Sequence, residues 1–187
     1  MLSNEIEQRK ESEPATSRGL GYFWPFGLAL LVFTLDQYTK WLTETNLGPY
    51  GAGKETEILG GLVRFRYVQN TGASFSLLKD QGWIFTLIAS MVCLGIIFWY
   101  SWRGTKYPWY QLCVGLLLAG AAGNLSDRLF KKGAVTDMIN IPWIEIFKNF
   151  NVADISLNIG VSILVITYVI QAAANAKKPE TNSEDSY

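Results

Sequence analysis

The chain has 187 residues, two cysteines, no histidine and a formal net charge of zero. A balanced charge gives no reason to expect nucleic acid as a partner, and the lack of histidine excludes a Ser-His-Asp site and any histidine-ligated metal. Hydrophobic residues make up 49% and charged residues 17% of the chain, whereas soluble domains are roughly 25% charged. Four apolar stretches approach the ~20 residues that cross a bilayer, at about 20–42, 82–102, 107–127 and 154–176. The sequence therefore predicts an α-helical membrane protein with four transmembrane helices.

The first span follows a polar, charged segment at 1–19, which we expect to be a disordered tail because it cannot bury enough apolar area to fold. Asp36 lies near the far end of this span, and Lys40 follows four residues later. That spacing puts both side chains on one helical face. Two interpretations remain open: an ion pair at the membrane interface, or part of a site.

An outer segment at 43–81 separates the first two spans. Residues 62–69 partly alternate between apolar and polar, as in a half-exposed strand. Asn70 and Gly72 then begin a run of small and polar residues before the second span, a pattern typical of a turn and a helix cap.

The second and third spans are joined by a short loop that contains Arg103 and Lys106 and no acidic residue. The positive-inside rule predicts that this loop is cytoplasmic. Both termini would then be cytoplasmic too, and the segments 43–81 and 128–153 would lie outside. We expect the polar residues 177–187 to form a second disordered tail.

The third span combines small and polar residues. Every fourth position is small, at Gly115, Ala119 and Gly123, which lets helices approach closely in lipid. The span ends with Asn124, Asp127 and Arg128 on one face. Because Arg128 directly follows Asp127, we expect this carboxylate to be ion-paired and structural.

The polar residues near the outer ends of the spans are predicted to form one site, because four alternating spans bring these ends to one face. They are Asp36, Asn70, Asn124, Asp127, Arg128, Asp137, Asn151 and Asp154. Two carboxyls close together in a poorly solvated site cannot both ionise, so they can act as general base and general acid on one water, as in aspartic proteases. Asp137 and Asp154 are the better candidates because neither has an adjacent cation, although spacing alone leaves other pairs open.

Five short motifs carry a family resemblance, namely Asp36-Gln-Tyr-Thr-Lys40, Asn70-Thr-Gly-Ala-Ser-Phe-Ser76, Gly120-Ala-Ala-Gly-Asn-Leu-Ser-Asp-Arg128, Val135-Thr-Asp-Met138 and Phe150-Asn-Val-Ala-Asp154. In this order they resemble the sequence boxes of bacterial lipoprotein signal peptidase (signal peptidase II). The resemblance covers 20–176, so we expect a four-span peptidase domain there. Two positions depart from the family pattern: Ser74 replaces an alanine, and Met138 replaces a common phenylalanine.

The resemblance implies an aspartyl endopeptidase of the bacterial inner membrane, with its active site on the periplasmic face. Such enzymes cut diacylglyceryl-modified prolipoproteins just before the lipidated cysteine. It implies Asp137 and Asp154 as the catalytic pair. Residues that shape the site or hold the substrate would be Asp36, Asn70, Gly72, Asn124, Arg128 and Asn151, and structural polar residues would be Lys40 and Asp127. The segment around 62–69 would form a small β-cradle, and the region before it would form a short, mobile periplasmic helix over the site.

The expected partners are the diacylglyceryl-prolipoprotein substrate, membrane lipid and globomycin-type cyclic peptide inhibitors. We expect no cofactor, no metal and a monomer. An alternative is an ion- or proton-translocating protein, since intramembrane carboxylates often mark transport. The cytoplasmic halves of the second and third spans carry no charged residue, which disfavours this alternative. Two further alternatives are a purely structural polar cluster and a Ser-Lys peptidase that uses Ser76 and Lys79.

Overall fold

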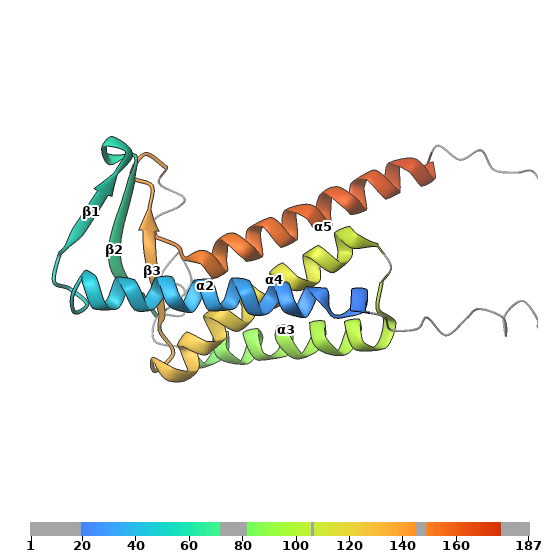
Figure 1. Ribbon diagram of the computed structural model, residues 1–187, viewed down its shortest axis with the longest axis horizontal. Coiled ribbons are helices and arrows are strands. Elements are labelled where there is room, and N and C mark those ends of the chain that lie inside the picture. Colours follow the sequence, from blue (N-terminus) through green and yellow to red (C-terminus); the bar gives the residue numbers. More distant parts are fainter. Residues whose placement is uncertain (1–19, 72–81, 106, 145–148, 177–187) are drawn as a thin grey trace, which may run out of the picture.

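The computed structural model describes residues 20–71, 82–105, 107–144 and 149–176. Four long helices form a bundle, and a three-stranded sheet lies against one end of it (Figure 1). The start of helix α2 and the end of helix α5 both lie at the opposite end. The two predicted tails and Gly72 fall outside the described residues.

Each long helix overlaps one of the four predicted spans. The helices are α2 (Trp24–Asn46, after the short 3-10 helix η1, Leu20–Tyr22), α3 (Gly82–Arg103), α4 (Pro108–Phe130) and α5 (Val152–Ala176). Both α2 and α4 carry a proline in the first turn, where a missing N–H removes no helical hydrogen bond. Helix α2 begins four residues later than expected and ends four residues later.

Two helices are long and apolar enough to cross a membrane. They are α3, at Trp83–Arg103 with mean hydropathy 2.0, and α5, at Val152–Ala174 with mean hydropathy 1.9. Among the described residues α2 and α4 do not reach this level, because polar side chains such as Asp36, Lys40 and Gln111 interrupt their apolar runs. Length and composition therefore indicate an α-helical membrane protein with two of the four predicted spans.

Helix α4 is central and contacts α2, α3 and α5. Its small residues allow this close packing, as the sequence predicts. A Cβ on Gly115 would lie 2.9 Å from both the Leu28 side chain and the Pro25 carbonyl oxygen of α2. A Cβ on Gly120 would lie 2.5 Å from the Ala153 carbonyl oxygen of α5.

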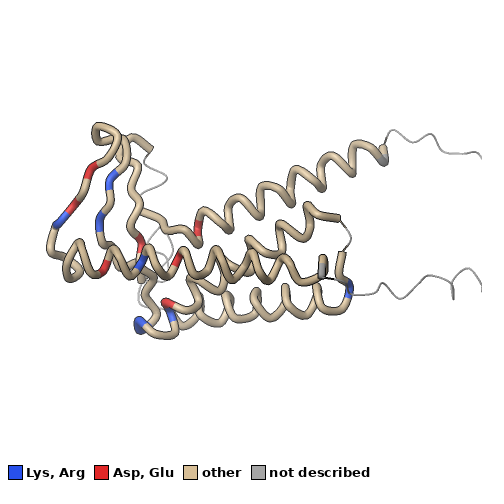
Figure 2. Tube along the Cα trace, in the orientation of Figure 1, with Lys and Arg blue, Asp and Glu red and all other residues tan. Residues whose placement is uncertain are grey.

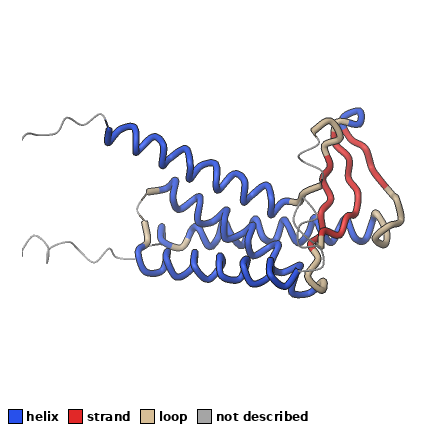
Figure 3. The backbone as a smooth tube through the Cα atoms, turned by 180° about the vertical axis from the view of Figure 1, so that it is seen from behind, coloured by secondary structure: helices blue, strands red, loops and turns tan. Residues whose placement is uncertain are grey.

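The sheet contains β1 (Glu55–Ile58), β2 (Val63–Asn70) and β3 (Val135–Asn140), in the order β1-β2-β3 with both pairs antiparallel. Its strands run across the direction of the helices (Figure 3). Strand β2 confirms the predicted strand at 62–69. Of the expected short helix before it, the described residues show a three-residue 3-10 helix, η2 (Leu59–Gly61), which follows β1.

Charged residues gather at the sheet end of the molecule, whereas the middle of the helix bundle carries almost none (Figure 2). The sheet end is also where α2 and α4 end and α5 begins. The fold thus brings the polar residues of distant sequence segments to one end of an apolar bundle.

Candidate active site

Asp154 lies in the first turn of α5, where Asn151 fixes its position. The Asp154 N–H donates to Asn151 Oδ1 at 2.9 Å, and the Asn151 N–H donates to Asp154 Oδ2 at 3.3 Å. This reciprocal arrangement is a capping box, which satisfies two N–H groups that a helix start leaves unpaired. Local sequence therefore both starts the helix and orients the carboxyl group.

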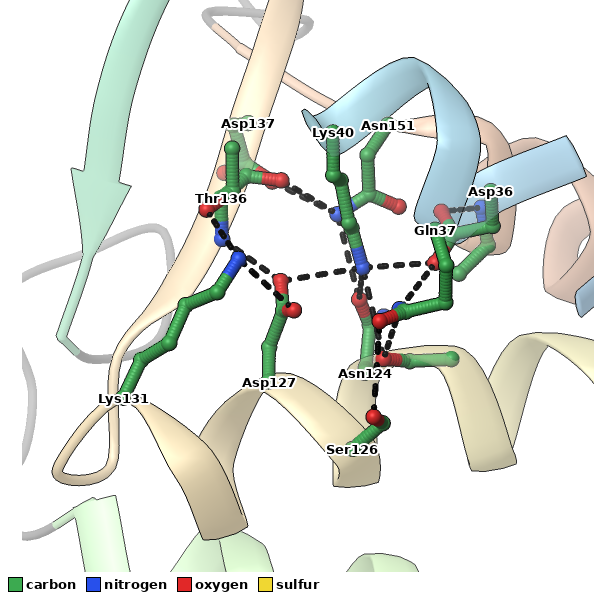
Figure 4. A network of polar contacts seen from close by, with 12 residues as sticks. Asp36, Gln37, Lys40, Asn124, Ser126, Asp127, Lys131, Thr136, Asp137 and Asn151 are labelled. Atoms are coloured by element: carbon green, nitrogen blue, oxygen red, sulfur yellow. Dashed lines mark hydrogen bonds and ion pairs between the residues drawn. The ribbon is translucent and has the colours of Figure 1, made fainter. Parts of the chain in front are cut away.

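Two buried amides, Asn151 and Asn124 (Figure 4), connect Asp154 with Asp137, which lies on β3. Asn151 Nδ2 donates to Asp137 Oδ1 at 2.8 Å and to Asn124 Oδ1 at 3.1 Å. Asn124 Nδ2 in turn donates to Asp154 Oδ1 at 2.8 Å. One continuous hydrogen-bonded chain therefore joins the two carboxyls, and it includes residues of α4, β3 and α5.

Asp137 is only 1% exposed. Burial raises its pKa to about 7, and the negative charge of Asp154 acts in the same direction. Hydrogen bonds lower it in part, including one from Asn70 Nδ2 to Asp137 Oδ2 at 3.0 Å. A carboxyl with such a pKa can hold or release a proton near neutral pH.

A buried ionic cluster lies beside this pair. Lys40 Nζ is 2.7 Å from Asp36 Oδ2 and 3.1 Å from Asp127 Oδ2, and all three side chains are at most 1% exposed. The ammonium also donates to Asn124 Oδ1 at 3.4 Å. The sequence left open whether Asp36 and Lys40 pair at the interface or belong to a site. The pair forms, and its burial and its contact with Asn124 place it beside the candidate site.

The two carboxylates of this cluster hold the elements that carry the candidate pair. Asp36 Oδ1 accepts from the Ala153 N–H at 2.9 Å, which fixes the first turn of α5. Asp127 Oδ2 accepts from the Thr136 N–H at 2.9 Å, which fixes β3 beside Asp137. Each bond uses a charged acceptor, and such hydrogen bonds are roughly twice as strong as neutral ones.

Asp127 is ion-paired, as expected, but its predicted pairing with Arg128 is wrong. The described partners are Lys40 and Lys131, at 3.1 and 3.0 Å. Successive residues on a helix do not face each other, whereas residues four apart do, which explains the contact with Lys131.

Arg128 instead points toward α3. Its guanidinium lies 5.7 Å from the centre of the Phe85 ring, and its Nη1 donates to the Asn124 carbonyl oxygen at 3.4 Å. It also lines a cavity of about 500 Å³ between the start of α3 and the end of α4, together with Trp83 and Lys132. Arg128 therefore lies at the edge of the network rather than inside it.

The structure brings almost all of the predicted site residues into contact. Joined by hydrogen bonds or ion pairs are Asp36, Lys40, Asn70, Asn124, Asp127, Asp137, Asn151 and Asp154, with Arg128 at their edge. Sequence reasoning missed Gln37, Glu44, Lys131 and Thr136. The four-residue spacing from Asp127 could have suggested Lys131, and adjacency to Asp36 and Asp137 could have suggested Gln37 and Thr136.

The candidate pair is held by amides rather than by cations. Among the described residues no ion pair involves Asp137 or Asp154. In the same part of the chain no cluster of three or more His, Cys, Asp or Glu could hold a metal. Two carboxyls in this setting can divide the roles of general base and general acid.

Comparison with known proteins identifies the family. The family model described as signal peptidase (SPase) II matches residues 28–170. The chain belongs to the signal peptidase II family. It is therefore a membrane aspartic peptidase, as the sequence motifs suggest, and nothing in the comparisons favours ion translocation.

Signal peptidase II relatives include the lipoprotein signal peptidase of Symbiobacterium thermophilum, which is 35% identical over 144 residues, 76% of this chain and 92% of that protein. The lipoprotein signal peptidase of Mycobacterium tuberculosis strain H37Rv is 40% identical, over 74% of this chain and 67% of that protein. Two solved structures of a bacterial membrane enzyme share the fold. One has a TM-score of 0.75 at 26% identity, covering 86% of this chain and 95% of that one. The other has a TM-score of 0.70 at 27% identity, with 80% and 94% covered.

Proposed function

We propose that Asp137 and Asp154 are the catalytic pair of this peptidase, which removes signal peptides from prolipoproteins. We further propose that the substrate is the diacylglyceryl-modified form and that the cut lies just before its lipidated cysteine. The observation that carries the proposal is the chain of amide hydrogen bonds, at 2.8 to 3.1 Å, that joins these two carboxyls through Asn151 and Asn124.

The proposed reaction uses one proton shared by the pair. The ionised carboxylate accepts a proton from a water, whose oxygen attacks the scissile carbonyl carbon. The protonated carboxyl then donates its proton to the amide nitrogen, the C–N bond breaks, and the signal peptide is separated from the lipidated cysteine. The pKa of about 7 at Asp137 supports such sharing near neutral pH.

The polar residues around the pair have distinct proposed roles. Asn70, Asn124 and Asn151 orient the two carboxyls through the hydrogen bonds described above, and Asp36 fixes the start of α5. Arg128 and Gly72 are proposed to hold the substrate backbone. The position of Arg128 beside the cavity between α3 and α4 supports its assignment.

We propose that all four helices cross the bacterial inner membrane, as one peptidase domain at 20–176. The nearly charge-free middle of the bundle supports this arrangement (Figure 2). The site would face the periplasm, and both termini and the loop after Arg103 would be cytoplasmic.

The two acyl chains of the substrate, each contributing about 0.8 kcal/mol per buried CH₂, would hold the scissile bond at the depth of the pair. Globomycin-type peptides would compete for the same site, and a monomer would suffice.

The test compares two forms of one prolipoprotein, with and without the diacylglyceryl group. Purified protein in phospholipid micelles is incubated with each form, and mass spectrometry identifies the new N-terminus. We expect cleavage of the modified form alone, with the lipidated cysteine as the first residue of the product. Equal cleavage of the unmodified form, or a cut at another bond, would contradict the proposed substrate and specificity.

A further inference from the structure

We propose that Glu44, Lys131 and Thr136 form a positioning cluster that fixes β3 against α2 and α4, so that Asp137 faces Asp154. The inference rests on the proposed catalytic pair. Glu44 and Lys131 lie outside the five sequence motifs, and Thr136 lies inside one of them but has no role assigned above. The three residues come from the last turn of α2, the residue just after α4 and the start of β3.

The cluster is closed by hydrogen bonds and ion pairs among its three members. Thr136 Oγ1 donates to Glu44 Oε1 at 2.6 Å, and Lys131 Nζ donates to Thr136 Oγ1 at 2.9 Å. Lys131 also pairs with Glu44 Oε1 and, at 3.0 Å, with Asp127 Oδ1. In Figure 4 the side chains of Lys131 and Asp127 both point toward Thr136.

Thr136 is held at each of its polar groups and is fully buried. Besides the hydroxyl contacts, its N–H donates to Asp127 Oδ2 at 2.9 Å, and its carbonyl oxygen accepts from Asn151 Nδ2 at 3.2 Å. Successive side chains on a strand point to opposite faces. Fixing the hydroxyl of Thr136 on one face therefore fixes the carboxyl of Asp137 on the other.

The ladder between β2 and β3 is irregular beside Asp137. Val68 pairs with Asp137, and the register shifts between Phe65 and Val68. A shift of this kind disrupts the ladder locally and bends the strand. An anchor from the helices beside Asp137 compensates for the irregular pairing.

Lys131 also balances the negative charge of the neighbouring buried carboxylates. The buried carboxylates of Asp36 and Asp127 share the single ammonium of Lys40, and Lys131 supplies Asp127 with a second cation. Burial lowers the pKa of Lys131, but hydrogen bonds to Glu44 and Asp127 outweigh that effect, so the pKa lies above its usual value. Lys131 therefore stays charged under working conditions.

The test uses a matched pair of substitutions at Thr136. Thr136→Val keeps the shape and removes the hydroxyl, whereas Thr136→Ser keeps the hydroxyl. Small misplacements of catalytic groups lower the rate of the chemical step by factors of ten to a hundred, so we expect Thr136→Val to lower kcat about tenfold with KM within about twofold. Thr136→Ser should retain kcat within about twofold. Each rate is divided by the folded fraction at the assay temperature, from thermal unfolding. An unchanged kcat per folded Thr136→Val molecule would overturn the inference.

A double-mutant cycle with Glu44→Gln separates a shared cluster from independent contacts. If both side chains act through one cluster, the double variant should be about as active as the less active of the two single variants. Losses that multiply would show independent effects and contradict the cluster.

Wild type and Asp137→Asn are assayed in parallel. If wild type does not cleave, or Asp137→Asn cleaves as fast as wild type, the proposed function fails; if these controls behave as expected but Thr136→Val retains full activity, only the positioning role fails.

Discussion

Replacing Asp137 by asparagine should stabilise the protein at alkaline pH while it removes activity. The pKa of Asp137 rises from its ordinary 3.8 to about 7 in the folded protein. This difference is about three pH units, and each unit corresponds to about 1.4 kcal/mol, so ionisation of Asp137 destabilises the fold by about 4 kcal/mol. Asparagine carries no charge and therefore removes this destabilisation.

The direction follows from proton binding. Because the folded pKa is the higher one, the folded state binds the proton more tightly than the unfolded state. The free energy of unfolding of wild type should therefore fall as pH rises from about 4 to about 7, and the whole decrease of about 4 kcal/mol should be present above about pH 7. Asparagine has only one acceptor oxygen, so one hydrogen bond from Asn70 or Asn151 is lost, at about 1 kcal/mol. The net gain for the variant is about 3 kcal/mol at alkaline pH.

The assay is thermal or denaturant unfolding of wild type and Asp137→Asn in the same detergent across this pH range. We expect the variant to be more stable at about pH 8.5 and the difference to vanish at about pH 4.5. Asn70→Ala serves as a control, because it removes a hydrogen bond without removing the charge and should not stabilise. A variant that is no more stable than wild type at alkaline pH would refute the argument that the fold tolerates an unfavourable buried charge for function.

Three further outcomes follow from the site and the helix packing. Lys40→Met leaves two buried carboxylates beside an apolar side chain and should destabilise by about 3–5 kcal/mol in unfolding experiments; a loss below about 1 kcal/mol would contradict the buried pairing. Gly120→Ala places a Cβ 2.5 Å from the Ala153 carbonyl oxygen and should destabilise by about 1–3 kcal/mol, whereas Gly27→Ala, with no atom within 4 Å of its Cβ, should not. The cleavage rate should fall above about pH 7 as Asp137 loses its proton, and a rate that still rises to about pH 9 would argue against a shared proton.

The helices could be predicted because their cause is local. Long apolar runs and first-turn prolines mark where α2, α3, α4 and α5 lie, and small residues at four-residue spacing mark the close contacts of α4. The candidate pair could also be proposed from the sequence, because Asp137 and Asp154 lack an adjacent cation, whereas Asp36 and Asp127 each have one within four residues.

Strands β1 and β3 and the ionic partners of Asp127 could not be predicted because their causes are not local. Strand β1 reads Glu-Thr-Glu-Ile and is exposed throughout, so it shows no apolar alternation. Strand β3 pairs with β2 across more than sixty residues of sequence, Asn70 with Val135 among them. The partners of Asp127 depend on how α2 and α4 pack, which no spacing in the sequence encodes for Lys40.

The central claim is that Asp137 and Asp154 share the chemistry. The most direct measurement is cleavage of a diacylglyceryl-modified prolipoprotein by wild type, Asp137→Asn and Asp154→Asn, each shown to be folded by the same unfolding assay. Since removing a member of a catalytic pair typically lowers rates by several orders of magnitude, we expect wild type to cleave before the lipidated cysteine and both variants to lose about 10³-fold or more. Folded variants that cleave at a rate close to that of wild type would contradict the assignment.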